Sequence, residues 1–443
     1  MSKQLDNDIS VSGQINEAMV RQLAGQGIKT IINNRPDAEE GGQPGNAALQ
    51  SVAESLGVKW VYLPLIAGQK PDPVLAQNYR KAIDEMPKPV HVFCRTGRRS
   101  EMIHQAAMNL PSNGQGVKSF DVVIVGAGTA GISVATSLLK RDADLDIVLI
   151  DLQDLGCRIY TFITTLLYML EEAARHGKTV WVLDRPNPAG RPVEGLTLLE
   201  GWESFVGAGP MPMRHGMTMG ELGHWFIATL GLQLEYRVIT MTGWAPDAAP
   251  GFGWPTERTW VNPSPNAANL SMARAYAGTV MLEGTTLSEG RGTTRPLELF
   301  GAPDIDARQL IADMQRMAPQ WLAGCALREC FFEPTFHKHV GQLCAGVQIH
   351  VEDPTHYDHT RFKPWRLQAL AFRALRLQAP GYALWRDFAY EYEHDRLAID
   401  LINGGPLLRE WVDDVSASPD VLETAAAADE AAWAEARKPY LLY

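Results

Sequence analysis

Three short stretches of this 443-residue sequence hold side chains whose types and spacing could do chemistry. A cysteine and several basic residues stand together at 91–100. Glycines recur at 122–131, and two glutamates and two arginines lie among glycines and threonines at 283–296. Each stretch predicts a different reaction, so the elements around them must decide which chemistry the chain performs.

The first stretch, HVFCRTGRRS, predicts a reactive thiol. Cys94 follows an apolar run typical of a buried strand and begins a loop that contains Gly97 and Arg99. Such a loop points backbone N–H groups and a guanidinium at an anion, and it favours the thiolate. Cys94 and Arg99 are therefore candidate catalytic residues, with an anion-binding loop that lacks catalysis as the alternative. Together with IINNRPD upstream, the motif resembles the phosphatase-like domain of β-lactamase-hydrolase-like proteins over residues 5–112.

The second stretch, VVIVGAGTAG, predicts a dinucleotide-binding turn. Gly126, Gly128 and Gly131 lie between an expected strand and an expected helix, and Asp151 ends the next strand. This is the context that a phosphate-binding glycine motif requires. Residues 120–151 resemble the first βαβ unit of flavoproteins such as sulfide:quinone oxidoreductases, which implies a possible FAD or NAD(P) site. The rest of a flavin fold is missing, so a lone βαβ segment without a cofactor is the alternative.

Seven motifs after Asp151 point to a third family. In order they are DLQDLGCRIYTFI, VLDRPNPAG, SFVGAGPMPMRHGMTMGEL, WVNPSPN, LEGTTLSEGRGTTRPLELFGAP, PTFHKHVGQLCAGVQIHV and YEYEHDRLAIDLINGG. Residues 151–443 thereby resemble the NamZ family of exo-β-N-acetylmuramidases. The resemblance implies an α/β domain, a smaller second domain and a sugar bound between them. It also implies release of terminal N-acetylmuramic acid from muropeptides or disaccharides of peptidoglycan, without a cofactor.

Within this resemblance, Glu283, Glu289 and Asp154 are the candidate catalytic carboxylates. Hydrolysis of a glycosidic bond usually needs two carboxyl groups, one to protonate the leaving oxygen and one to attack or to activate water. A structural alternative stands beside each candidate. Glu283 could be a buried partner of Arg291, and Asp154 with Arg158 could form an i,i+4 pair on a helix.

The candidate substrate ligands are polar or aromatic side chains from the same motifs. A guanidinium can grip the carboxylate of muramic acid with two hydrogen bonds, and amides, imidazoles and tyrosines suit sugar hydroxyls and rings. No metal is expected, because the histidines are equally explained as polar core residues. The candidates are Arg158, Tyr160, Asp184, Arg185, Asn187, His215, Glu221, Asn266, Arg291 and His337.

The sequence departs from the NamZ pattern before Asp151. Family members carry a Ser-Pro-Glu-His-Gly motif there, whose glutamate is a leading candidate for the acid or base, and this sequence has no such motif. A muramidase with impaired activity is therefore one hypothesis. The alternatives are an FAD- or NAD(P)-dependent oxidoreductase fused to a tyrosine phosphatase-like domain, and a fusion in which neither module is complete.

The bulk composition excludes several classes of protein. A net charge of −11 argues against binding to nucleic acid. The sequence has no run of 18 apolar residues and no apolar region near its start, which predicts no membrane span and a cytoplasmic location. Five scattered cysteines do not form a disulfide framework.

The expected fold class is α/β. Alternating strand and helix patterns predict an N-terminal phosphatase-like α/β domain, a Rossmann-type βαβ segment, a muramidase-like α/β domain and a smaller α+β domain at the C-terminus. Their expected ranges are 1–112, 118–151, 151–300 and 301–443. The run at 361–380 predicts an amphipathic helix.

Overall fold

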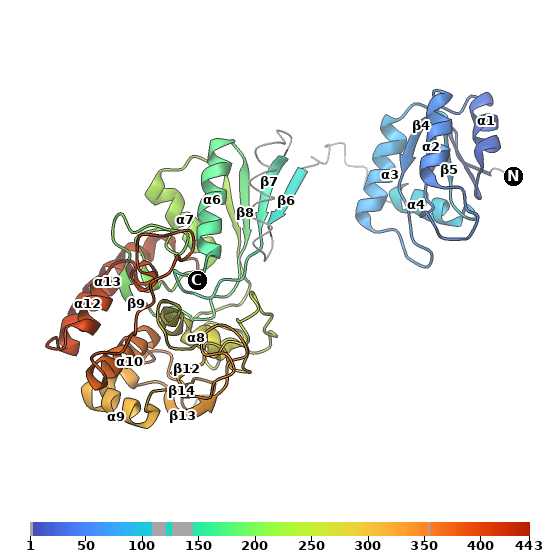
Figure 1. Ribbon diagram of the computed structural model, residues 1–443. Coiled ribbons are helices and arrows are strands. Elements are labelled where there is room, and N and C mark those ends of the chain that lie inside the picture. Colours follow the sequence, from blue (N-terminus) through green and yellow to red (C-terminus); the bar gives the residue numbers. More distant parts are fainter. Residues whose placement is uncertain (1–2, 109–120, 126–144, 353–354) are drawn as a thin grey trace. The chain divides into compact units, whose positions relative to one another are not determined.

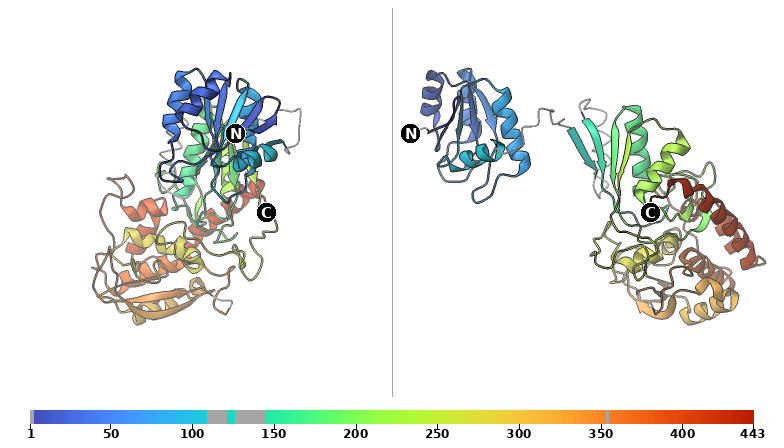
Figure 2. Two further views of the ribbon diagram at one scale, coloured as in Figure 1. Left: turned by 90° about the vertical axis from the view of Figure 1, so that its right-hand side faces the viewer. Right: turned by 180° about the vertical axis from the view of Figure 1, so that it is seen from behind.

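The computed structural model describes residues 3–108, 121–125, 145–352 and 355–443. The chain divides into two compact units, Met1–Lys118 and Ser119–Tyr443, and each is described by itself. Helices and strands alternate along the described chain (Figures 1 and 2). The expected α/β class is therefore confirmed.

The first unit is a five-stranded sheet between two pairs of helices. Its strands are β1 Lys3–Asp6, β2 Ile9–Ser12, β3 Thr30–Asn33, β4 Lys59–Tyr62 and β5 Val90–Phe93. Its helices are α1 Glu17–Gly25, α2 Asn46–Ser55, α3 Pro73–Glu85 and α4 Arg98–Met108. The strand order is β1-β2-β5-β3-β4, and only the β1–β2 pair is antiparallel.

Alternating side chains give this sheet two buried faces. Ile31 points into the core under α1 and α2, and Ile32 points into the core under α3 and α4. A strand that is covered on both sides therefore needs adjacent apolar residues such as Ile31 and Ile32. The strand β5 lies in the middle of the sheet and delivers the cysteine loop at its carboxyl end.

The second unit begins with a four-stranded parallel sheet in the order β11-β8-β7-β6. Its strands are β6 Asp121–Val125, β7 Leu145–Ile150, β8 Thr179–Leu183 and β11 Tyr236–Ile239. Its helices are α6 Phe162–Arg175 and α7 Met219–Leu230, which pack against each other and against β8. Phe162, Leu166, Met169 and Ala173 recur at helical spacing on the buried side of α6.

The remainder of the second unit is a three-stranded antiparallel sheet with helices. The strands β12 Leu299–Ala302, β14 Cys344–His350 and β13 Ala326–Phe332 pair in that order. The other elements are a hairpin, β9 Glu194–Thr197 with β10 Pro212–Arg214, the helices α8 Leu270–Thr279, α9 Ala307–Met317, α10 Pro364–Gln378, α11 Ala398–Asn403, α12 Leu407–Asp413 and α13 Pro419–Ala436, and the 3₁₀ turns η1 Val280–Gly284, η2 Pro319–Leu322 and η3 Lys438–Tyr440. The expected boundary between the domains 151–300 and 301–443 falls inside the strand β12. The division into these two domains stays a prediction.

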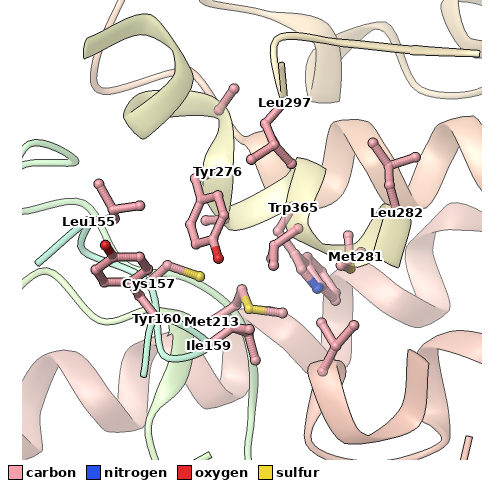
Figure 3. Packing of buried hydrophobic residues seen from close by; sticks show 14 of the residues in the cluster. Leu155, Cys157, Ile159, Tyr160, Met213, Tyr276, Met281, Leu282, Leu297 and Trp365 are labelled. Atoms are coloured by element: carbon pink, nitrogen blue, oxygen red, sulfur yellow. The ribbon is translucent and has the colours of Figure 1, made fainter. Parts of the chain in front are cut away.

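One large hydrophobic core runs through the described part of this second unit, beside a small cluster of Leu299, Phe332 and Cys344. Tyr160, from the loop before α6, meets Tyr276 of α8 in the same buried cluster (Figure 3). The helix α13 returns to the hairpin, where Glu430 and Asp429 accept hydrogen bonds from the backbone N–H groups of β9. The expected α/β and α+β parts therefore share a packed interior. No helix in the described part of the chain is long and apolar enough to cross a lipid bilayer.

Candidate active site

A charged cluster forms where η1 leads into the loop before β12. Arg291 donates through Nη2 to Glu283 Oε1 at 2.6 Å and through Nε to Glu289 Oε1 at 2.9 Å. The Tyr390 hydroxyl donates to Glu283 Oε2 at 2.7 Å. Two nitrogens of the guanidinium are thus already engaged. A two-point grip on a substrate carboxylate by that edge of Arg291 would have to displace a glutamate.

Glu289 is the buried centre of this cluster. Lys338 Nζ lies 2.7 Å from Glu289 Oε2, and His337 Nδ1 lies 3.3 Å from Oε1. Burial alone would raise the pKa of Glu289, but His337, Lys338 and Arg291 together hold it well below the ordinary value. Glu289 is therefore a fixed anion, whereas the Glu283 side chain is 21% exposed and can meet a ligand.

A second cluster surrounds Asp154, in the loop after β7. Asp154 Oδ2 accepts the Gly156 N–H at 2.6 Å, and His215 Nε2 lies 3.5 Å from the same oxygen. His215 Nδ1 accepts the Met217 N–H at 3.2 Å, which leaves Nε2 to carry a proton. Asp154 Oδ1 and Gln153 Oε1 are buried and have no hydrogen-bond partner in the described part of the chain. Buried polar atoms are normally paired, so this cluster suits a polar ligand.

Two tyrosines lie between these clusters. The rings of Tyr160 and Tyr276 meet edge to face with centroids 6.0 Å apart (Figure 3). The charge of Asp154 contributes to the raised pKa of Tyr160, and the charge of Glu283 contributes to that of Tyr276, although burial is the larger cause for both. The two candidate carboxylates are therefore neighbours of one pair of tyrosines.

The DRPNP loop follows β8 and is joined to the loop after β7. Arg185 Nε donates to Asp151 Oδ1 at 2.6 Å and Nη2 donates to Oδ2 at 3.0 Å. Asn187 Nδ2 donates to the Met217 carbonyl at 2.9 Å. Asp184 accepts from the Thr218 hydroxyl and from the Gly220 N–H, so it fixes the start of α7. Asp184 also lines a hollow of about 710 Å³ at the carboxyl ends of β8 and β11.

Other candidates have structural partners. Arg158 is buried and donates to the carbonyls of Leu196, Met211 and Ile402, so the expected helical pair with Asp154 is wrong: these residues lie in a loop before α6. Glu221 is buried, pairs with Arg191 at 2.6 Å and closes the capping box of α7. The remaining candidate, Asn266, is half-buried in the loop before α8.

In the first unit, Cys94 lies at the start of the loop between β5 and α4. Its Sγ accepts the Gly97 N–H at 3.1 Å. Burial alone would raise the pKa of the thiol, but the backbone N–H groups of Ser100, Thr96 and Arg99 at the start of α4 lower it. The Arg99 guanidinium is turned to Glu39, with two hydrogen bonds of 2.8 Å.

Of the expected dinucleotide-binding residues, the structure describes only Asp151. Gly126, Gly128 and Gly131 lie outside the described residues. Asp151 is described, and its carboxylate is held by Arg185. In a dinucleotide site this carboxylate would face the ribose.

Sequence patterns missed two contacts in the Glu283 cluster. Lys338 follows the candidate His337 and, like it, reaches Glu289; it also donates to the carbonyls of Leu282 and Thr285. Tyr390 is 107 positions from Glu283. The motif YEYEHD contains this tyrosine, but no spacing rule connects it to the glutamate.

Comparison with known families shows to which family the second unit belongs. Residues 134–271 match the N-terminal domain of the exo-β-N-acetylmuramidase NamZ, and residues 274–443 match its C-terminal domain. Residues 134–443 belong to the NamZ family. The matched N-terminal domain begins after the glycine motif and includes β7, so the strand that ends before Asp151 lies inside the NamZ match.

Individual relatives agree with this assignment. The peptidoglycan β-N-acetylmuramidase NamZ of Bacillus subtilis is 41% identical over 211 residues, which are 47% of this chain and 50% of that protein. The chain thus spans about half the length of that relative. Two DUF1343 family proteins of Bacteroides fragilis share the fold at 20% identity, with TM-scores of 0.58 and 0.52, over 96% of this chain and 97% and 98% of theirs.

The first unit matches a different family. Residues 2–110 match the phosphatase-like domain of the β-lactamase hydrolase-like protein. Beta-lactamase hydrolase-like proteins of Xylella fastidiosa and Agrobacterium fabrum are 34% and 32% identical over 100 and 96 residues, less than a quarter of each chain. Both expected resemblances are therefore confirmed. Nothing in these comparisons supports the flavin or nicotinamide oxidoreductase, and a muramidase requires no cofactor.

Proposed function

We propose that residues 134–443 form an exo-β-N-acetylmuramidase that releases terminal N-acetylmuramic acid from peptidoglycan fragments. The observation that carries this proposal is the match, in order, to both domains of the NamZ family, together with 41% identity to the Bacillus subtilis muramidase. The carboxylates and tyrosines of the two clusters supply the residue types that such a reaction needs.

Within this proposal, Glu283 and Asp154 are the reacting carboxyl groups. Both adjoin the pair of tyrosines. Glu283 accepts a hydrogen bond on each oxygen, from Arg291 and from Tyr390, whereas Asp154 accepts on one oxygen and its other oxygen is left for a ligand. Glu289 is a positioning residue, because it fixes Arg291, which in turn orients Glu283. These residues would act without the family's Ser-Pro-Glu-His-Gly motif.

The test is hydrolysis of para-nitrophenyl N-acetylmuramide by the purified chain and by Glu283→Gln and Asp154→Asn variants. We expect release of nitrophenol by the wild type and a loss of about 10²–10⁴-fold in each variant, the usual effect of removing a catalytic acid or base. Glu435→Gln, an exposed change on α13, should keep full activity. A folded wild-type chain that binds the muramide without hydrolysing it would contradict the proposal. Full activity in Glu283→Gln would contradict the role of Glu283.

We propose a second activity for residues 2–110: thiol-dependent hydrolysis of a phosphate monoester. The N–H groups around the Cys94 sulfur favour this activity, because they stabilise a thiolate and would also bind the anion. Hydrolysis of para-nitrophenyl phosphate should depend on Cys94 and vanish in Cys94→Ser. Equal rates in both proteins would contradict it.

A further inference from the structure

A groove of about 700 Å³ lies beside α6 and α7, and none of the candidate catalytic carboxylates just described lines it. We call it the α6–α7 groove. Its floor is apolar and includes Leu167, Trp225 and Phe226, of which Trp225 and Phe226 pack tightly with ring centroids 4.9 Å apart. A volume of this size is typical of small-molecule sites. The groove is therefore preformed and large enough for a small ligand with an apolar body.

Carboxylates surround the mouth of the groove. Glu171, Glu203, Glu391 and Glu393 line it, and its described lining contains no lysine or arginine. Glu393 pairs with Arg396 at 2.9 Å, whereas the other three glutamates make no ion pair within the described part of the chain. Three uncompensated negative charges therefore face one apolar pocket.

Aromatic rings stand at the same mouth. Tyr168 is 41% exposed and Tyr392 is 83% exposed, and the Tyr392 ring meets the Phe205 ring edge to face at 5.7 Å. Exposed aromatic faces beside carboxylates are the usual partners of organic cations. A ligand that covers the Tyr392 ring, which is 83% exposed, would gain the free energy of burying its apolar surface.

A tight turn holds two of these groups in place. Tyr390 and Glu393 exchange two backbone hydrogen bonds of 2.9 Å, and Glu391 and Tyr392 between them have φ of 45° and 73°. Residues other than glycine rarely adopt this conformation. Because Tyr390 is anchored on Glu283, the turn directs Glu391 and Tyr392 to the groove.

We propose that the α6–α7 groove binds a small amphipathic cation, an apolar or aromatic body that carries an ammonium or guanidinium group. The body would lie on Trp225 and Phe226, and the charge would lie among Glu171, Glu203 and Glu391 against the face of Tyr392. Neither Glu283 nor Asp154 lines this groove, so binding alone tests the proposal.

The test compares three probes of one shape: 4-phenylbutylammonium, 4-phenylbutanol and 4-phenylbutyrate, titrated against the full chain by ligand-observed NMR. We expect the ammonium to bind at least about tenfold more tightly than the alcohol, a difference of about 1.4 kcal/mol, and the carboxylate not to bind. The Glu171→Gln/Glu203→Gln double variant should lose this preference, and Tyr392→Ala should weaken the ammonium alone.

A matched control separates the site from the net negative charge of the chain. Glu257→Gln/Glu435→Gln removes the same two charges from exposed positions outside the groove, and it should keep the tenfold preference. Equal affinity for the three probes would reduce the groove to an apolar hollow and overturn the proposal. An equal loss of preference in the control double variant would overturn it as well.

Discussion

Glu289 is a buried anion whose removal should be costly. Its side chain is inaccessible and pairs with two cations, Arg291 and Lys338, of which the Lys338 side chain is 8% exposed. Glu289→Gln would leave that ammonium buried without its charged partner, which typically costs about 3–5 kcal/mol. We expect the free energy of unfolding of the second unit to fall by this amount in urea denaturation, monitored by tryptophan fluorescence.

An exposed pair provides the control for this change. Glu435 and Lys438 lie 2.6 Å apart but are 72% and 61% exposed. Glu435→Gln should therefore alter stability by less than about 1 kcal/mol. If Glu289→Gln and Glu435→Gln lowered the free energy of unfolding by similar amounts, burial of the Glu289 ion pairs would not be the source of their stabilising effect.

The Cys94 thiol should ionise at a lower pH than any other cysteine in the described part of the chain. Backbone N–H groups lower its pKa from the ordinary value of 9.0, although it is buried. Burial raises the pKa of the other four thiols to about 11 or 12: Cys157, Cys325, Cys330 and Cys344. The ultraviolet absorbance of thiolate should therefore rise in one step below pH 9, and Cys94→Ser should abolish that step alone. A step that survives in Cys94→Ser would contradict the assignment.

At this scale, sequence proximity decided what could be predicted. Glu283, Glu289 and Arg291 lie within nine positions, so their clustering follows from local chain geometry. Tyr390 reaches the same cluster only because the chain returns from α10, and Asp154 meets His215 only because the β9–β10 hairpin folds back. Contacts between distant segments depend on packing, which single-sequence patterns do not specify.

The helix α7 provides a prediction at the scale of an element. Thr218 is its N-cap: its hydroxyl accepts the Glu221 N–H and donates to the buried Asp184. Thr218→Val would remove the cap and one donor of a buried carboxylate, at a cost of about 1–3 kcal/mol. Burial already raises the pKa of Asp184, and loss of this donor should raise it further, because the Thr218 hydrogen bond favours the ionised form. Thermal unfolding followed by circular dichroism measures the loss.

The N-cap of α13 provides a control for the Thr218→Val change. Ser418 occupies the N-cap position there, but its side chain makes no capping hydrogen bond. Ser418→Ala should therefore leave the unfolding temperature almost unchanged. If both substitutions lowered it equally, the cap and the bond to Asp184 would not be the cause.

Elements with strong periodic patterns were predictable, and those with buried charges were not. The alternation of strands and helices, on which the expected α/β class rests, is present in the described chain. The helix α10 also forms, but it is buried on all sides from Pro364 to Leu375, so its expected amphipathic character is wrong. Arg366 pairs with Glu423 and Glu430, and Arg373 donates to four carbonyls. In the sequence these arginines suggest a solvent-exposed helix face, but inside the fold Arg366 is paired with carboxylates and Arg373 with backbone carbonyls.

At the scale of the whole molecule, the chain carries two sets of proposed catalytic side chains in two units with separate cores. The thiol site uses only residues of the first unit, and the carboxylate site uses only residues of the second. Changes that leave each core intact should therefore act on one activity alone. Cys94→Ser should abolish phosphate-ester hydrolysis and leave muramide hydrolysis unchanged, and Glu283→Gln should do the reverse. Both rates are measured on the same full-length preparations, and a double variant should lose both. If Cys94→Ser slowed muramide hydrolysis by more than about twofold, a change of about 0.4 kcal/mol in the barrier, the two units would be coupled and their sites could not be treated as independent.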